Sequence, residues 1–129
     1  MKLPASRPPS LIFQGKVQTS EFGRLHIRLY LAALTGEGVF CVCIPGARAP
    51  AVSPATATSI AEEVRRRILA HTGGRAVALH LFLPYSPDSS GRERWAKAVF
   101  VIPGRRREPL GPPSWSIVGR SWVAPMLDR

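Results

Sequence analysis

The segment 24–31 carries the side chains best suited to binding chemistry in this sequence. Basic and aromatic residues occupy every second position there: Arg24, His26, Arg28 and Tyr30. Alternate side chains of a β-strand point to one face and repeat about every 7 Å, so these four would stand in a row. Guanidinium groups bind phosphate through paired hydrogen bonds, and a tyrosine ring can stack on a base. We therefore expect this row to contact nucleic acid.

The preceding segment has polar residues at the same spacing. Four side chains would extend the row on a neighbouring strand: Ile12, Gln14, Lys16 and Gln18. Of these, Lys16 adds a further cation to the expected surface. The alternative interpretation is the solvated outer face of an amphipathic strand, which has the same alternating pattern.

A second basic cluster lies in a proline- and glycine-rich loop over residues 103–114, and consists of Arg105, Arg106 and Arg107. Three adjacent positive charges in a short loop repel one another and gain from an anionic partner. Such a loop can follow a phosphate backbone and release its counterions. We expect it to clamp the backbone; a solvated connecting loop is the alternative. By contrast, Arg66 and Arg67 each follow a glutamate by four residues, which indicates a solvated helix face.

The titratable residues do not indicate catalysis. Of the three histidines, only His26 lies on the expected polar face, where it can act as acid or base in a metal-free nuclease. Structural roles account for His80 in an apolar strand and for His71 at a helix end. The pair Cys41 and Cys43 lacks the spacing and ligand number of a zinc site, and carboxylates are too few for a two-metal nuclease. We expect no enzyme activity, no metal and no cofactor.

The composition agrees with a polyanionic partner. Eighteen basic residues stand against eight acidic ones, which gives a net charge of +10 and a pI of about 11.3. A GC-rich genome explains the preference for arginine over lysine but not the shortage of Asp and Glu, so the charge favours an anionic partner. With no signal-peptide pattern, no disulfide framework and no long apolar run, we expect a cytoplasmic protein without membrane contact.

The elements that must position these residues form an α+β domain. Apolar patterns predict strands over residues 11–19, 24–31, 39–44, 76–83, 93–102 and 115–123. Residues 54–71 have apolar positions at helical spacing, with Ser53 as N-cap and Pro54 in the first turn. The order β-β-β-α-β-β-β predicts an antiparallel sheet of five or six strands with one long helix packed on it. The domain would span residues 11–124, between an extended tail at 1–10 and a short tail at 125–129.

These observations favour a non-enzymatic nucleic-acid-binding protein, as a small basic subunit or accessory of a nucleoprotein complex. The alternative is a protein-interaction or assembly module, for instance a viral or mobile-element accessory protein or a homo-oligomer. The apolar run 39–44 and the aromatics Trp115 and Trp122 would form its interface, whereas Trp95 is expected in the core. A small nuclease that depends on His26 is the third hypothesis.

Overall fold

Six strands and one long helix make up most of the chain, in the order that the sequence predicts. The computed structural model describes residues 10–19, 23–32, 38–44, 54–72, 75–85, 94–104 and 108–127. The strands are β1 (Ser10–Thr19), β2 (Gly23–Ala32), β3 (Gly38–Cys43), β4 (Val77–Tyr85), β5 (Arg94–Ile102) and β6 (Ser114–Gly119). The helices are α1 (Pro54–Thr72), the short 3-10 helix η1 (Arg120–Trp122) and the one-turn helix α2 (Ala124–Leu127). The predicted α+β class is confirmed.

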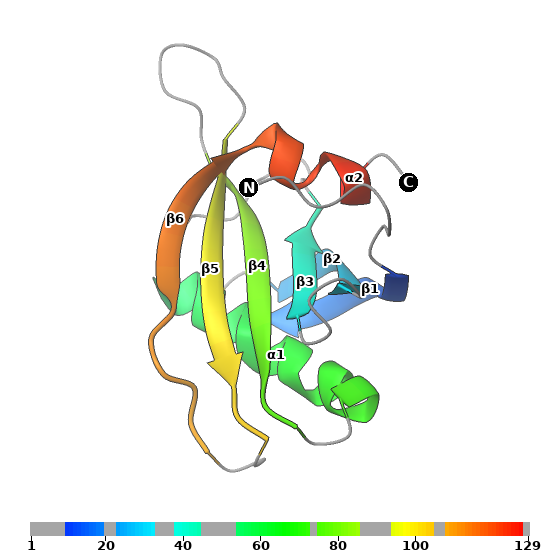
Figure 1. The fold of residues 1–129 in the computed structure, drawn as a ribbon, viewed down its shortest axis with the longest axis vertical. Coiled ribbons are helices and arrows are strands. Elements are labelled where there is room, and N and C mark those ends of the chain that lie inside the picture. Colours follow the sequence, from blue (N-terminus) through cyan, green and yellow to red (C-terminus); the bar gives the residue numbers. More distant parts are fainter. Residues whose placement is uncertain are drawn as a thin grey trace.

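The strands form a single sheet whose spatial order is the chain order, from β1 at one edge to β6 at the other (Figure 1). Neighbouring strands are antiparallel except at the centre, where β3 and β4 are parallel. This exception follows from the connection: α1 lies between β3 and β4 and carries the chain back, so β4 starts from the same end. Apart from this central pair, the sheet is antiparallel, as predicted.

The long helix α1 packs on one face of the sheet, which we call the helix face (Figure 1). The predicted apolar stripe of the helix is fully buried there: Ile60, Ala61, Val64 and Ile68. The sheet meets it with a layer of large apolar side chains that includes Ile27, Leu81 and Phe100. Burial of each large aliphatic side chain stabilises the fold by about 1.5–3 kcal/mol, so this layer is the main core.

The strand β3 is covered on both faces, as its continuous apolar sequence predicts. All six of its residues are buried. Cys41 and Cys43 are free thiols on the helix face, while Phe40 and Val42 belong to a smaller cluster on the opposite face. Burial raises the pKa of the Cys41 thiol well above its ordinary value, which keeps it protonated and unreactive.

An irregularity in β1 redirects one side chain of the expected polar row. The pairing of β1 with β2 shifts between Leu11 and Phe13, which leaves Ile12 without a partner residue. Because an extra residue in a strand breaks the simple alternation of faces, both Ile12 and Phe13 pack against the helix-face core. The polar row on β1 therefore starts at Gln14 rather than at Ile12.

The opposite face of the sheet, the second face, is covered in part by residues 120–127 (Figure 1). Val123 and Met126 of this segment are fully buried among aromatic side chains of the sheet: Tyr30, Phe40, Phe82 and Trp95. The last strand thus ends at Gly119 instead of continuing to residue 123. Residues 125–127 of the expected short tail belong instead to α2. They dock on the sheet because the apolar side chain of Met126 covers part of the second face.

Residues 1–9, the greater part of the expected N-terminal tail, lie outside the described residues, and Ser10 already belongs to β1. Within the described residues, no helix combines the length and the apolar character needed to cross a membrane.

Candidate nucleic-acid interface

The strands β1 and β2 bring the predicted polar side chains together on the second face. Their register places Lys16 opposite His26 and Gln18 opposite Arg24, with Gln14 opposite Arg28. Residues directly opposite in an antiparallel pair share a face, so six polar side chains form two adjacent rows. Neither strand contains an acidic residue. We call this surface the β1–β2 polar face.

The cations of the β1–β2 polar face differ in how far they reach the solvent. Lys16 and Arg24 are exposed, and His26 is half-buried. Neither Lys16 nor Arg24 forms an ion pair with any residue that the structure describes. These two charges are thus exposed to solvent on the second face.

Arg28 and Tyr30 instead attach the 120–127 segment to the sheet. The Tyr30 hydroxyl donates a hydrogen bond of 2.7 Å to the carbonyl oxygen of Met126. The Nη1 group of Arg28 donates one hydrogen bond to the same carbonyl oxygen of Met126, at 3.1 Å, and another to the carbonyl oxygen of Leu127, at 3.3 Å. The last carbonyls of a helix have no partner within the helix, so side-chain donors stabilise them. The two residues therefore anchor α2.

Because they anchor α2, Tyr30 and Arg28 are less accessible to an external ligand than the sequence suggested. Tyr30 is only 3% exposed, so its ring offers no free face on which a base could stack. The Arg28 guanidinium is half-buried, and its positive charge lies against backbone carbonyls. Of the five residues expected at this face, the structure leaves Lys16, Arg24 and His26 at the surface.

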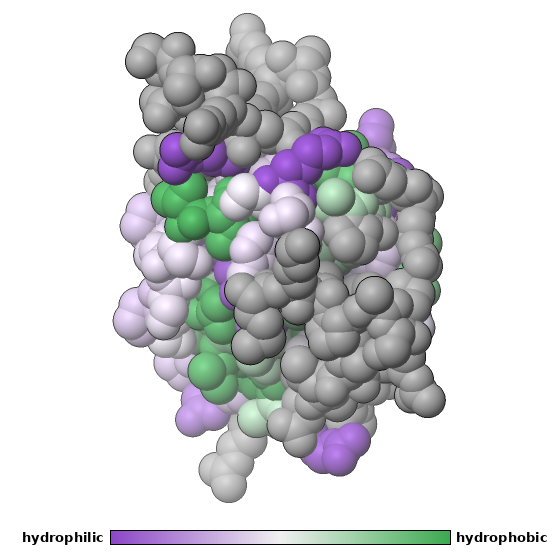
Figure 2. Space-filling model, turned by 45° about the horizontal axis from the view of Figure 1, so that its top comes forward, coloured by the Kyte–Doolittle hydropathy of each residue, from purple (hydrophilic) through white to green (hydrophobic). Residues whose placement is uncertain are grey.

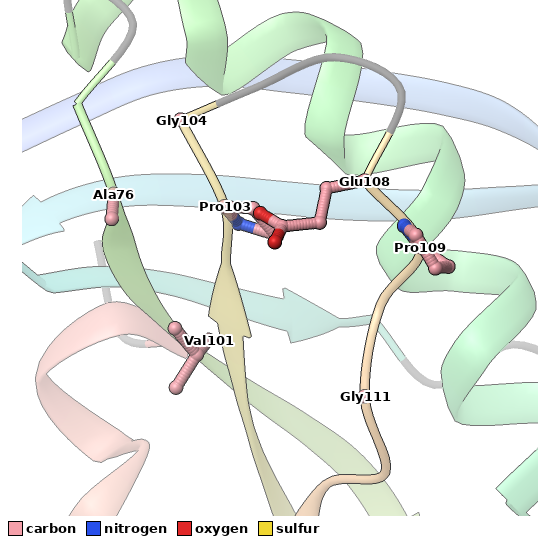
Figure 3. Close-up of a pocket in the computed structure, with 7 residues that line it drawn as sticks. All are labelled: Ala76, Val101, Pro103, Gly104, Glu108, Pro109 and Gly111. Carbon is pink, nitrogen blue, oxygen red and sulfur yellow. The ribbon is translucent and has the colours of Figure 1, made fainter.

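The basic cluster Arg105, Arg106 and Arg107 lies outside the described residues, so its expected role stays a prediction. The two ends of its loop border an open hollow of about 670 Å³ at the end of β5. The hollow is lined by Ala76, Val101, Pro103, Gly104, Glu108, Pro109 and Gly111 (Figure 3). Among the described residues of this lining, Glu108 is the one that carries a charge, and its carboxylate points towards Pro103. The described lining residues include no nucleophile paired with a base.

The helix arginines are accounted for within the fold. Arg66 pairs with Glu63 at 3.2 Å, one residue nearer than the expected partner Glu62. The Arg67 guanidinium lies 4.2 Å from the centre of the Phe13 ring, a cation–π contact. Arg65 is 6% exposed. Arg66 and Arg67 are exposed, as a solvated helix face predicts, whereas the buried Arg65 does not fit that prediction.

A partly buried pair of polar side chains on the second face, His80 and Lys97, was not expected from the sequence. The His80 ring packs against the Phe40 ring, with centres 4.9 Å apart, and its Nδ1 atom is buried without a hydrogen-bond partner. Nearby, Lys97 Nζ lies 4.4 Å from the centre of the Trp122 ring. Burial, and secondly the charge of Lys97, lower the pKa of His80 to about 4. His80 is thus neutral at physiological pH, and the one available signal was its position within an apolar strand.

His26 and His80, the two histidines whose side chains the structure describes, do not form an acid–base pair. His26 on β2 and His80 on β4 share the second face, but β3 lies between their strands. The register of β3 places Ile44 beside His26 and Phe40 beside His80. The two side chains are thus separated by roughly 10 Å across the sheet and about 13 Å along it. The described residues also contain no cluster of His, Cys, Asp or Glu that could hold a metal ion.

Some of the apolar residues that could form a protein interface are buried in the fold, and others are exposed. Residues Val39–Cys43 lie inside the fold and Trp95 is 1% exposed, so neither can contact a partner. Four large hydrophobic side chains of the described part are exposed: Leu11, Val101, Trp115 and Ile117. Figure 2 shows hydrophobic surface emerging between polar residues on one side of the molecule. Of the aromatics named for an interface, Trp115 is exposed and Trp122 is half-buried.

No known protein family, no curated protein and no solved structure matches this chain. The function must therefore be argued from the site itself.

The first test concerns the attachment of the 120–127 segment. We expect Met126→Ala to lower the free energy of unfolding by about 2–5 kcal/mol, because it opens a cavity in a fully buried position. Tyr30→Phe should cost about 1 kcal/mol, since it removes one buried hydrogen bond. Urea denaturation measures both. Leu11→Ala, at an exposed position, is the control and should change stability by less than about 0.5 kcal/mol. A neutral Met126→Ala variant would contradict the docked segment.

The second test concerns His80. In the unfolded chain its pKa returns to about 6.5, whereas in the fold it is about 4, so only the unfolded chain takes up this proton between these values. The contribution of neutral His80 is fully present above pH 6.5 and is lost as the pH falls towards 4. With allowance for solvent screening, we expect a loss on the order of 1 kcal/mol between pH 7 and pH 5. Urea unfolding at both pH values should show a smaller loss in His80→Gln than in the wild type, while the non-titrating control Leu11→Ala, at an exposed position, loses as much as the wild type.

Proposed function

We propose that this protein binds nucleic acid through the β1–β2 polar face, without regard to sequence and without catalysis. The observation that carries the proposal is the facing arrangement of Lys16 with His26 and of Gln18 with Arg24 on one face. Cations and amides on neighbouring strands offer phosphate oxygens both charge and hydrogen bonds. No carboxylate of either strand competes for them.

The spacing of this face supports contact with a nucleic-acid backbone. Lys16 and Arg24 are two positions apart along the paired strands, which separates them by roughly 7 Å. Successive phosphates of an extended single strand repeat on a comparable scale. The half-buried His26 lies directly opposite Lys16 on β2, two residues from Arg24 on the same strand. Binding would depend mainly on charge, because Tyr30 is buried and cannot supply a stacking platform.

The net charge of +10 supports the same proposal from outside the site. A strongly positive protein attracts nucleic acid over a Debye length, and neutralised phosphates release counterions. The logarithm of the affinity should then fall linearly with the logarithm of the salt concentration. Fluorescence anisotropy with labelled single- and double-stranded DNA and RNA measures this slope. Absence of binding to every one of these at low salt would overturn the proposal.

A double variant tests the location of the site. We expect Lys16→Gln with Arg24→Gln to weaken binding to single strands and to reduce the salt slope by roughly 1.4, at about 0.7 for each lost phosphate contact. The matched control is Arg66→Gln with Arg67→Gln, which removes the same charge from α1 on the other side of the sheet. Equal losses in the two variants would show that net charge alone determines binding and would contradict this site.

A triple variant tests the basic loop separately. If Arg105, Arg106 and Arg107 clamp the backbone, changing all three to Gln should reduce the salt slope for single strands by roughly 2, at about 0.7 for each contact. The same anisotropy titration measures the change. An unaltered slope would restrict the site to the β1–β2 polar face.

A further inference from the structure

The two edges of the sheet differ in how they are protected. The edge strands are β1 and β6, and within the part of the chain that the structure describes each leaves one row of backbone N–H and C=O groups without a strand partner. β1 has an irregular register beside Leu11 and carries Lys16, and both features discourage a further strand from pairing. β6 pairs with β5 in an unbroken register, and its six residues include no charge and no proline. The β6 edge therefore lacks the usual protection.

The same strand carries an exposed apolar strip. Trp115 is 39% exposed and Ile117 is 48% exposed, although both lie on the helix face opposite Ala98 and Ala96. They project from the edge of the sheet, where α1 does not enclose them. An open backbone edge beside exposed aromatic and β-branched side chains is the arrangement used in recognition by strand addition.

We propose that β6 pairs antiparallel with β6 of a second copy of this chain, so that two domains share one continuous sheet. A second copy is favoured because the strand is complementary to itself. A two-fold axis through Ser116, perpendicular to the sheet, sets Trp115 opposite Ile117 of the other copy, and this contact occurs twice. Axes centred on Trp115 or Ile117 would instead set an apolar side chain against Pro113 or Gly119.

The protein's positive net charge does not cause repulsion at the proposed β6–β6 contact. No residue of β6 is charged, so the two strands place no like charges directly opposite each other. The Lys16, Arg24 and His26 surface lies at the other edge of the sheet, on β1 and β2, which are five and four strands away from β6. Pairing through β6 therefore leaves the β1–β2 polar face of each copy open, and it does not depend on nucleic-acid binding.

A pair of cysteine variants tests the register. In the proposed dimer, Ser116 faces Ser116 of the second copy with Cα atoms about 4.5–5.5 Å apart, which suits a disulfide. Ser116→Cys should therefore form a disulfide-linked dimer on mild oxidation of the full chain. Ser114→Cys is the matched control, because its two copies would lie about 13 Å apart along the strands. The native Cys41 and Cys43 are buried and do not compete. Equal cross-linking of both variants would overturn this register.

A charge placed on the edge tests the interface without cross-linking. Nuclease-treated protein at high salt should show twice the monomer mass of 14.1 kDa in light scattering or sedimentation as its concentration is raised. Ile117→Lys should remain monomeric, whereas Val101→Lys and Leu11→Lys, at exposed positions off this edge, should still dimerise. A wild type that stays monomeric at every concentration would overturn the proposal, as would loss of the dimer in Leu11→Lys alone. Far-UV circular dichroism verifies that each variant is folded.

Discussion

The central strands of the sheet are apolar on both faces, and the rest of the fold depends on covering both. The six residues of β3 are all buried, and β4 contributes Leu81 to one apolar layer and Phe82 to the other. On the helix face the nineteen residues of α1 provide a broad cover. On the second face the cover is much smaller, since it consists of η1, α2 and the residue between them. That segment has little intrinsic helical stability, so docking must hold it in place.

The limited size of the second cover explains where polar chemistry appears. Val123 and Met126 shield the aromatic cluster above β3 to β5, and the cover ends at Arg28 and Tyr30, which anchor it. Beyond these anchors the second face of β1 and β2 is open, and its side chains are polar. At the other end of the cover, His80 and Lys97 are partly enclosed beside aromatic rings, which opposes their charged forms. The open basic surface and the neutral histidine thus have one cause.

Because the sheet is open, its basic surface and its uncharged apolar edge lie at opposite ends. Because the sheet does not close into a barrel, both edge strands remain, with the basic face beside β1 and the uncharged edge at β6. A dimer formed through β6 about an axis perpendicular to the sheet would keep both basic faces on the same side of the joint sheet. The two faces would then lie at its far ends, and under the proposed nucleic-acid binding one long strand could contact both. Such a bivalent arrangement raises the effective affinity without new contacts.

The sequence by itself determined the six strands, the long helix and most of the residues at each strand face, because alternation and helical spacing are local properties of the chain. It missed the irregularity that turns Ile12 to the helix face and the short helices η1 and α2. It correctly paired the segment of Lys16 with that of Arg24, and it identified β3 as a central strand from its unbroken apolar run. Only the tertiary structure decided what Arg28 and Tyr30 do, because their hydrogen-bond partners are 96 to 99 residues away. Alternating polar residues in a strand look the same in the sequence whether their side chains face solvent or bind a distant segment of the chain. The parallel β3–β4 pair, the burial of Met126 and the enclosure of His80 depend on the same long-range contacts, which no local pattern of residues encodes.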